Sequence, residues 1–166
     1  MQCVWRDFFW REMSVGSVKR VTLYTIGFTE KSAETFFGLL QQAGVKRVWD
    51  VRLNNVSQLA AFAKREDLRY FARELCSAGY VHAREMAPTP AMLDEYRKGG
   101  KIWDDYEKQF LELMKERAIE QLFSPAQLHG GCLLCSEAKP HHCHRRLVAE
   151  YLQRKWKNSV EIKRLG

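Results

Sequence analysis

Residues 21–51, with the sequence VTLYTIGFTEKSAETFFGLLQQAGVKRVWDV, decide the fold of this chain. The run VTLYTI is rich in β-branched residues and is followed by Gly27, which is typical of a buried strand. Ser32 can cap a helix, and apolar residues follow it at helical spacing until Gly44. The run VKRVWDV then has the composition of a second strand. The segment therefore predicts two parallel strands joined by a helix.

The same alternation of strands and helices continues toward the C-terminus. Further strands are predicted over 80–84, 131–135 and 160–162, and further helices over 66–78, 90–98, 103–123 and 143–156. Pro125 is expected to stop the helix over 103–123. We therefore expect residues 21–166 to form a single three-layer α/β domain. Its sheet should be mostly parallel, with four or five strands and helices on both faces.

Residues 1–20 are expected to be an N-terminal extension. They are rich in aromatic residues, but Arg6, Asp7 and Arg11 interrupt them before a signal-peptide core can form. Met13 begins a sensible lead-in to the first strand, so we hypothesise that the native chain starts there. No apolar run approaches the roughly 20 residues that span a membrane. These features predict a cytoplasmic protein without a membrane partner, whose five cysteines are reduced thiols or metal ligands.

The positive charge is concentrated near the C-terminus. The formal net charge is +7 at pH 7. Between residues 139 and 157 only Glu150 is acidic, and the basic residues are Lys139, Arg145, Arg146, Arg154, Lys155 and Lys157. A concentrated basic surface attracts anions, which predicts an anionic small molecule or a nucleotide as the partner. The alternative is a non-catalytic nucleic-acid-binding module, in which Tyr151 and Trp156 offer stacking faces.

Four of the five histidines and three of the five cysteines lie between His129 and Arg146. Within this segment Cys135 comes at the end of a predicted strand. Cys143 and His144 come at the start of a predicted helix. This combination of thiols, imidazoles and guanidiniums is open to three interpretations.

The first interpretation is a reactive thiol. A helix N-terminus and neighbouring cations stabilise a thiolate. Cys135 or Cys143 is then the candidate nucleophile, and His144 is the candidate base. The spacing differs from the Cys-x5-Arg loop of the cysteine phosphatases, since Arg145 follows Cys135 by ten residues and Cys143 by two. The segment is therefore no standard phosphatase loop.

The second interpretation is a metal site. Cys135, Cys143 and His144 offer ligand types that bind zinc or iron. Cys132 also precedes Cys135 by three residues, but side chains three apart on a strand point to opposite faces. Cys132 is therefore expected to be a core residue, and the metal alternative depends on the other three.

The third interpretation is a site that holds an anion without chemistry. The loop before the helix presents backbone N–H groups, and Arg145 adds a cation beside them. Polar residues also follow the other predicted strands, namely Gly27, Asp50 and Arg52. Because the carboxyl ends of parallel strands meet at one edge of a sheet, these residues should gather near Cys135.

Arg52 and Asp50 have different expected roles at this edge. A guanidinium such as that of Arg52 can hold a phosphate or carboxylate with two hydrogen bonds. Asp50 follows an apolar run, so the burial of its carboxylate requires either an ion-pair partner or a catalytic role. The partner would be Arg52 or Arg84, and the catalytic role would be proton transfer.

Four motifs are spread over residues 21–155: LYTIGF at 23–28, DVR at 50–52, PTP through YRKG at 88–99, and LC-x-E-x5-CHR at 134–145. Together they resemble the domain-of-unknown-function family 488. The matching positions are Gly27, Asp50, Arg52, Cys135, Glu137, Cys143, His144 and Arg145. The family pattern has Gly-His where this chain has Gly27-Phe28, so a histidine role is absent at that point. The resemblance implies one α/β domain with a shared site, and it supplies no reaction.

We therefore expect an enzyme that acts on a phosphate-bearing or nucleotide-like molecule. Arg52 and Arg145, with the backbone at Gly27, would hold the anion. Cys135 or Cys143 would be the reactive thiol, Asp50 or His144 would move protons, and Glu137 would support the site. No cofactor is assigned.

Overall fold

A computed structural model describes residues 20–56, 60–157 and 159–166 of the chain. The expected extension over 1–20, apart from Arg20, and the hypothetical start at Met13 lie outside the described residues. The strands within these ranges are β1 (Val21–Gly27), β2 (Arg47–Asp50), β3 (Gly79–His82), β4 (Gly131–Cys135) and β5 (Val160–Leu165). They form one five-stranded sheet in the order β3-β2-β4-β1-β5, and all four pairings are parallel. The predicted α/β fold class with a parallel sheet is confirmed.

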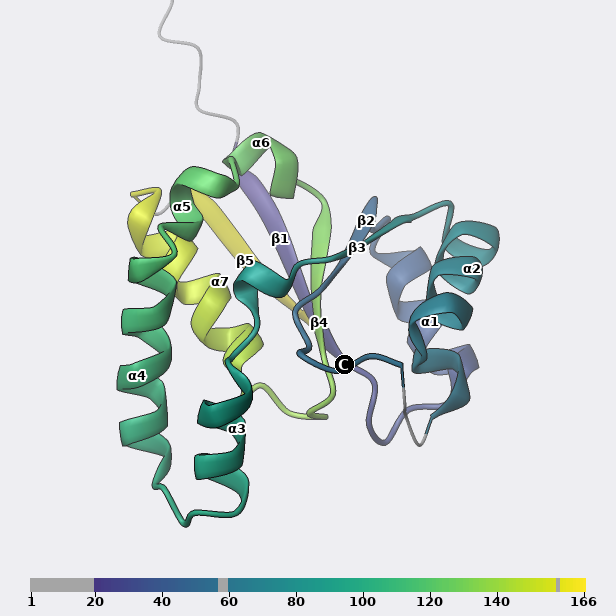
Figure 1. The fold of residues 1–166 in the computed structure, drawn as a ribbon. Helices are drawn as coiled ribbons and strands as arrows, with labels where there is room; N and C mark the ends of the chain where they lie inside the picture. Colours follow the sequence, from purple (N-terminus) through teal and green to yellow (C-terminus); the bar gives the residue numbers. More distant parts are fainter. Residues whose placement is uncertain (1–19, 57–59, 158) are drawn as a thin grey trace, which may run out of the picture.

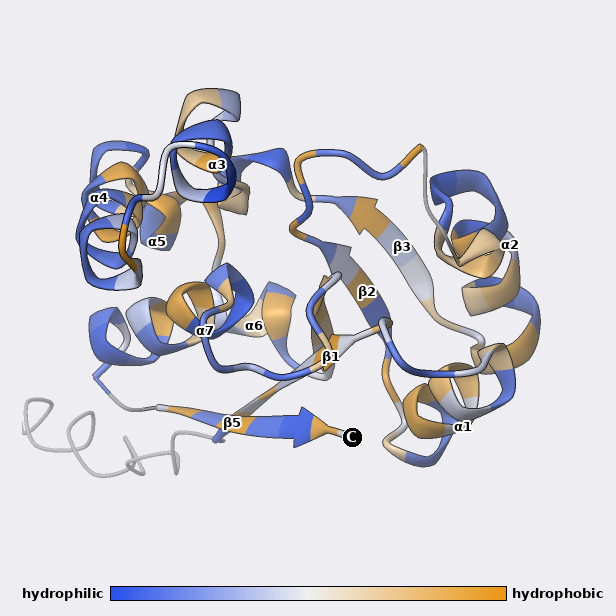
Figure 2. Cartoon of the chain, turned by 90° about the horizontal axis from the view of Figure 1, so that it is seen from below, coloured by the Kyte–Doolittle hydropathy of each residue, from blue (hydrophilic) through white to orange (hydrophobic). Residues whose placement is uncertain are grey.

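Helices cover both faces of this sheet (Figures 1 and 2). On one face lie α1 (Ala33–Gln42) and α2 (Arg65–Cys76). On the other lie α3 (Pro90–Arg97), α4 (Trp103–Glu116), α5 (Ile119–Leu122), α6 (Pro125–Leu128) and α7 (His144–Lys155). The sheet therefore separates two hydrophobic cores, one under α1 and α2 and a larger one under α4 and α7.

The connections on either side of β4 diverge at its carboxyl end. The chain leaves β1 and β2 toward α1 and α2 on one face, whereas it leaves β4 toward α7 on the opposite face. Since β4 lies between β1 and β2, the loops on either side of its end diverge. In open α/β sheets such a switch point is the usual place for a ligand.

The two cysteines of β4 lie on opposite faces of the sheet, as the strand spacing predicts. Cys132 packs in the core under α1 and α2, and Cys135 belongs to the core under α4 and α7. Only Cys135 is therefore on the side from which α7 brings further polar residues.

The helix predicted over 103–123 is confirmed as far as Glu116 and is wrong beyond it. The chain leaves the helix after Glu116, and Ala118 adopts a left-handed backbone conformation with φ 47°. Pro125 does not act as a stop but begins α6, because its fixed φ suits the first turn of a helix. Ser124 caps that helix through a reciprocal pair of hydrogen bonds with Gln127.

Several strand ends also differ from the prediction. The second strand is shorter than 45–51, and the third ends at His82, because a 3-10 turn begins at Arg84. The last strand is longer than 160–162 and reaches Leu165, since β5 pairs with β1 along its whole length.

A substitution at Gly27 should destabilise the fold strongly. A Cβ atom there would lie 1.7 Å from the carbonyl oxygen of Glu137, which is backbone and cannot move alone. We expect Gly27→Ala to lower the free energy of unfolding by about 1–3 kcal/mol, the usual cost of overpacking. Urea denaturation followed by circular dichroism measures this change.

Gly38→Ala is the matched control, because a Cβ at Gly38 in α1 would meet no atom within 4 Å. Alanine at a helix interior should raise the free energy of unfolding by about 0.5–1 kcal/mol. Equal effects of the two substitutions would show that the close approach at Gly27 has no energetic importance.

Candidate functional site

The ends of three neighbouring strands bring the predicted polar residues to one edge of the sheet. Gly27 at the end of β1 pairs with Cys135 at the end of β4, and Asp50 at the end of β2 pairs with Leu134. The strand register therefore places Gly27, Asp50 and Cys135 close together, as expected from the parallel sheet.

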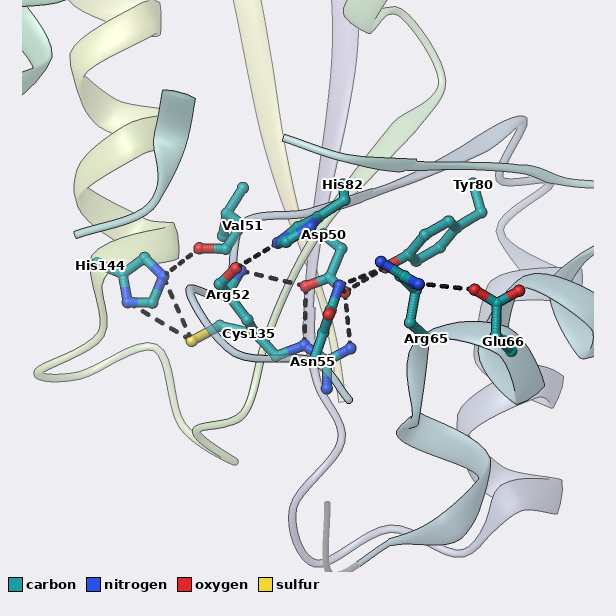
Figure 3. A network of polar contacts seen from close by, with 10 residues as sticks. All are labelled: Asp50, Val51, Arg52, Asn55, Arg65, Glu66, Tyr80, His82, Cys135 and His144. Atoms are coloured by element: carbon teal, nitrogen blue, oxygen red, sulfur yellow. Dashed lines mark hydrogen bonds and ion pairs between the residues drawn. The ribbon is translucent and has the colours of Figure 1, made fainter. Parts of the chain in front are cut away.

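Asp50 is the centre of a buried network of hydrogen bonds (Figure 3). Its two carboxylate oxygens accept from Nε and Nη2 of Arg52 at 2.8 and 2.7 Å. The Tyr80 hydroxyl donates to Oδ2 at 2.6 Å, and Asn55 donates to the same oxygen at 3.2 Å. Burial alone would raise the pKa of Asp50, but Arg52 and Tyr80 hold that pKa below its ordinary value. Asp50 is thus an ionised partner of Arg52.

The Arg52 guanidinium has one nitrogen that Asp50 does not use. The Arg52 side chain is 3% exposed, and its Nη1 atom is buried without a hydrogen-bond partner within the described ranges. In Figure 3 this nitrogen points away from Asp50. A buried donor without an acceptor costs about 1–3 kcal/mol, so this nitrogen offsets part of the stabilisation that the Asp50–Arg52 pair provides.

Arg145 lies in the same region, and its two terminal nitrogens donate to the protein itself, whereas its buried Nε has no partner among the described residues. Its Nη1 atom donates to the carbonyl oxygen of Glu137 and to Sγ of Cys143, and its Nη2 atom donates to the carbonyl of Ala138 at 3.3 Å. The loop after β4 is thereby held against Gly27, which explains why no Cβ fits there. In this arrangement Arg145 shapes the loop.

Cys135, Cys143 and His144 come together at the start of α7. Their sulfur and nitrogen atoms all lie within 4.8 Å of one another, and all three residues are buried. Sγ of Cys135 lies 3.6 Å from Nδ1 of His144. The Nε2 atom of His144 lies 2.8 Å from the carbonyl oxygen of Val51. Because a carbonyl only accepts, we assign the hydrogen to Nε2, which leaves Nδ1 facing Cys135.

The three side chains set one another's protonation. A hydrogen bond from the Cys143 thiol and the charge of His144 hold the pKa of Cys135 well below that of an ordinary thiol, although burial opposes this. The same hydrogen bond and burial raise the pKa of Cys143. Burial alone would lower the pKa of His144, but the negative charge of Cys135 raises it. The cluster therefore favours a Cys135 thiolate beside a His144 imidazolium, with Cys143 as a neutral donor.

A cavity of about 410 Å³ opens beside Cys135. Its walls come from the segment after β2, from α3, from the start of α4 and from the loop after β4. The lining residues are Arg52, Leu53, Asn54, Val56, Leu93, Tyr96, Arg97, Trp103, Tyr106, Cys135, Ser136, Glu137, His142 and His144. Its volume lies in the lower part of the range for small-molecule sites. Cys135 and His144 are thus accessible to a ligand from one side.

The site contains residues that the sequence analysis did not select. Tyr80 and Asn55 complete the shell around Asp50, and the backbone carbonyl of Val51 fixes His144. The carbonyl oxygen of Glu137 accepts a hydrogen bond from Arg145, while its side chain is exposed at the cavity. The structure brings together all eight residues that the motifs select.

Several basic side chains near the C-terminus form ion pairs within the protein and are therefore not free to bind an anion. Arg146 pairs with Glu107 and Glu150, and Lys155 pairs with Glu120. Tyr151 is 6% exposed, and Trp156 packs against the larger core. The two rings that were expected to offer stacking faces are therefore engaged within the protein.

The fold and the site define a parallel α/β protein with a buried cysteine–histidine cluster at the switch point of its sheet. The family model described as "Domain of unknown function DUF488" matches residues 32–152, and the chain belongs to this family. The expected resemblance is confirmed. Searches of curated proteins and of solved structures find no match. Among the described residues no helix has the length and apolar character needed to cross a membrane.

The buried pair of Asp50 and Arg52 yields a stability prediction. Asp50→Asn would leave the guanidinium charge of Arg52 uncompensated in the interior, which typically costs about 3–5 kcal/mol. Because the pKa of Asp50 is lowered in the folded state, the wild-type pair stabilises the fold above the ordinary carboxyl pKa of about 3.9. This stabilisation is lost as the pH falls through the lowered pKa. The Asp50→Asn variant should lack this pH-dependent contribution to the free energy of unfolding.

Urea denaturation between pH 3 and pH 7 measures both effects. Glu74→Gln is the control, since Glu74 forms a comparable pair with Arg73 at 2.7 Å, with side chains 47% and 69% exposed. Exposed pairs contribute little, so this variant should change the free energy of unfolding by less than about 1 kcal/mol. An Asp50→Asn variant as stable as the wild type would contradict the structural role of the pair.

Proposed function

We propose that this protein is an enzyme that uses Cys135 as a nucleophile on a small phosphate-bearing or nucleotide-like molecule. The observation that carries the proposal is the buried cluster of Cys135, Cys143 and His144, whose ligand atoms lie within 4.8 Å of one another beside the cavity and lower the pKa of Cys135. A buried thiolate with dedicated partners in a cleft is the arrangement that nucleophilic catalysis requires.

The geometry suggests how the residues share the chemistry. Sγ of Cys135 would form a bond to an electrophilic atom of the substrate. The leaving group would depart with its electron pair and take the proton from Nδ1 of His144. Water would then attack the covalent intermediate, with neutral His144 accepting its proton, and the Cys135 thiolate would be released. The overall reaction is a hydrolysis and needs no oxidant or reductant.

The remaining predicted residues would act around this centre. Asp50 is fully engaged by Arg52, Tyr80 and Asn55, so His144 is the better candidate for proton transfer. Cys143 would serve as the hydrogen-bond donor that keeps Cys135 ionised.

A metal centre at Cys135, Cys143 and His144 is the second candidate. Zinc ligands at ordinary sulfur and nitrogen bond lengths in a tetrahedral site lie about 3.6 Å apart. Sγ of Cys135 and Nδ1 of His144 are separated by 3.6 Å. The contact of His144 with a backbone carbonyl is also common for metal-bound histidines. A bound metal would occupy the same thiolate, so the two candidates exclude each other.

The nucleophile proposal predicts an unusual pH profile for alkylation. We expect iodoacetamide to label Cys135 at a rate that stays nearly constant from pH 8 to pH 6. An ordinary thiol, with a pKa of about 8.5, loses about tenfold per pH unit over that range. Cys143→Ala removes the main donor to the thiolate, so its Cys135 rate at pH 6 should fall about tenfold or more. Peptide mass spectrometry at timed quenches gives the rates.

Two comparisons within the same experiment test whether the flat pH profile is specific to Cys135. Cys76 is half-buried and burial raises its pKa, so its labelling should increase steadily with pH. Cys132→Ala alters the opposite core and should leave the Cys135 profile unchanged. An ordinary thiol profile at Cys135 in the folded protein would refute the nucleophile proposal.

Metal content separates the two candidates. Under the nucleophile proposal, protein purified without chelator or affinity tag should contain far less than one equivalent of zinc or iron per chain. The measurement is elemental mass spectrometry of wild type and of Cys135→Ala. About one equivalent in the wild type, lost in the variant, would establish the metal centre instead.

A further inference from the structure

Cys143 stands at the start of α7 without contributing to the cap of that helix. It is the N-cap residue, and at this position serine, threonine, aspartate or asparagine usually accepts a hydrogen bond from the first turn. The Cys143 side chain makes no such bond. Its sulfur instead lies within 4.8 Å of Sγ of Cys135 and accepts from Nη1 of Arg145 at 3.3 Å. The Cys143 thiol is therefore available to Cys135.

The two cysteines differ in their access to the cavity. Cys135 lines the cavity, whereas Cys143 does not, although the two residues are almost equally buried, with 3% and 1% of their surface exposed. A small molecule in the cavity therefore meets Cys135 first, and Cys143 is the second thiol that the protein itself supplies. Such low exposure favours a small oxidant, such as a hydroperoxide, over a bulky disulfide.

The chain around the two cysteines allows their sulfurs to come closer. A disulfide requires a sulfur–sulfur distance of about 2.05 Å, so the present separation of up to 4.8 Å has to shrink. Cys135 is held at the end of β4, which pairs with β1 on one side and with β2 on the other. Cys143 follows a loop over residues 136–142 that contains neither helix nor strand. An adjustment of this loop can therefore bring Cys143 to Cys135 while the sheet stays in place.

No other cysteine among the described residues can take the place of either partner. Cys132 packs in the core under α1 and α2, on the opposite face of the sheet. Cys76 ends α2 and packs against that same core. Within the described ranges, Cys135 and Cys143 are thus the two cysteines that can form a disulfide with each other.

We propose that Cys135 and Cys143 form a reversible disulfide when a hydroperoxide enters the cavity. With hydrogen peroxide, the Cys135 sulfur attacks one oxygen, the O–O bond breaks, and the other oxygen leaves as water with the thiol proton. Cys135 is then a sulfenic acid. The Cys143 sulfur attacks Sγ of Cys135, and the hydroxyl group leaves as water with the Cys143 proton. Two thiols are oxidised to one disulfide, and one peroxide is reduced to two molecules of water.

The disulfide regulates the same site that the proposed function uses. This consequence rests on the proposed function, because oxidation consumes both the Cys135 nucleophile and the Cys143 thiol beside it. Reduction by an external dithiol returns both residues. The oxidation itself requires neither a substrate nor the hydrolytic reaction, so it is measured independently.

The test treats the protein as purified with hydrogen peroxide and then maps its cysteines. The remaining thiols are blocked with iodoacetamide after unfolding, and the chain is digested without reduction by a protease that cleaves after glutamate. Glu137 lies between the two cysteines, so this digestion separates them unless a disulfide joins them. We expect peptide mass spectrometry to find the Cys135 and Cys143 peptides linked, and dithiothreitol to separate them. Folded protein that forms no such link under peroxide would overturn the proposal.

Three variants establish the order of the two steps. In Cys143→Ala the sulfenic acid at Cys135 has no second thiol, so dimedone should trap it and further oxidation should resist dithiothreitol. In Cys135→Ala we expect Cys143 to be oxidised about tenfold more slowly than in the wild type, because Cys143 does not line the cavity. Cys132→Ala is the matched control from the same strand and should change neither the link nor its rate. Equal oxidation rates of Cys143 in the wild type and in Cys135→Ala would show that the assigned order is wrong.

Failure of the disulfide and failure of the nucleophile remain distinguishable. The alkylation profile of Cys135 tests the nucleophile without peroxide, and the linked peptides test the disulfide without a substrate. A disulfide together with an ordinary alkylation profile would support the redox reaction and refute the nucleophile. A flat alkylation profile without a disulfide would refute the redox reaction alone.

Discussion

The arrangement of the site depends on a single buried guanidinium, that of Arg145. It is 2% exposed, and its terminal nitrogens bond to the carbonyl oxygens of Glu137 and Ala138 and to Sγ of Cys143. A charge in the interior is tolerated only when such partners surround it. Those partners lie on the loop between β4 and α7, so satisfying Arg145 folds that loop back over the end of β1. The start of α7 is thereby fixed beside the end of β4.

This constraint explains why the motif residues form one unit. The loop can approach β1 only where no Cβ intervenes, which requires Gly27. Once the loop is seated, Cys143 and His144 reach Cys135, and the carbonyl of Val51 at the end of β2 fixes the ring of His144. A second buried pair, Asp50 with Arg52, holds the neighbouring strand end. The low pKa of Cys135 is therefore a consequence of packing at three strand ends.

The sequence predicts the sheet well because buried parallel strands have a simple pattern. Apolar runs bounded by glycines and helix caps fix the order of elements, and strand alternation separates Cys132 from Cys135. The sequence does not predict that the helix is interrupted at Ala118, since nothing in an alanine indicates a left-handed backbone conformation. It also cannot show whether a guanidinium is free. Arg52 and Arg145 are expected to hold an anion because of their charge, yet their partners become visible only with the strand register and the loop in place. Tyr80 reaches Asp50 from the adjacent strand β3, a relation that depends on register alone.

Whether a cationic side chain is already paired or still free also determines which ligand groups it can bind in the cavity. A site that stabilises a thiolate has to supply positive charge and hydrogen-bond donors. Here those groups are already paired with the thiolate and with the carboxylate of Asp50. A phosphate deep in the cavity would compete with Cys135 for His144 and with Asp50 for Arg52, and it would weaken the nucleophile that it approaches. The lowered pKa of Cys135 and the pairing of Arg52 with Asp50 are therefore two results of one electrostatic balance, in which His144 and Arg52 both face an acidic partner.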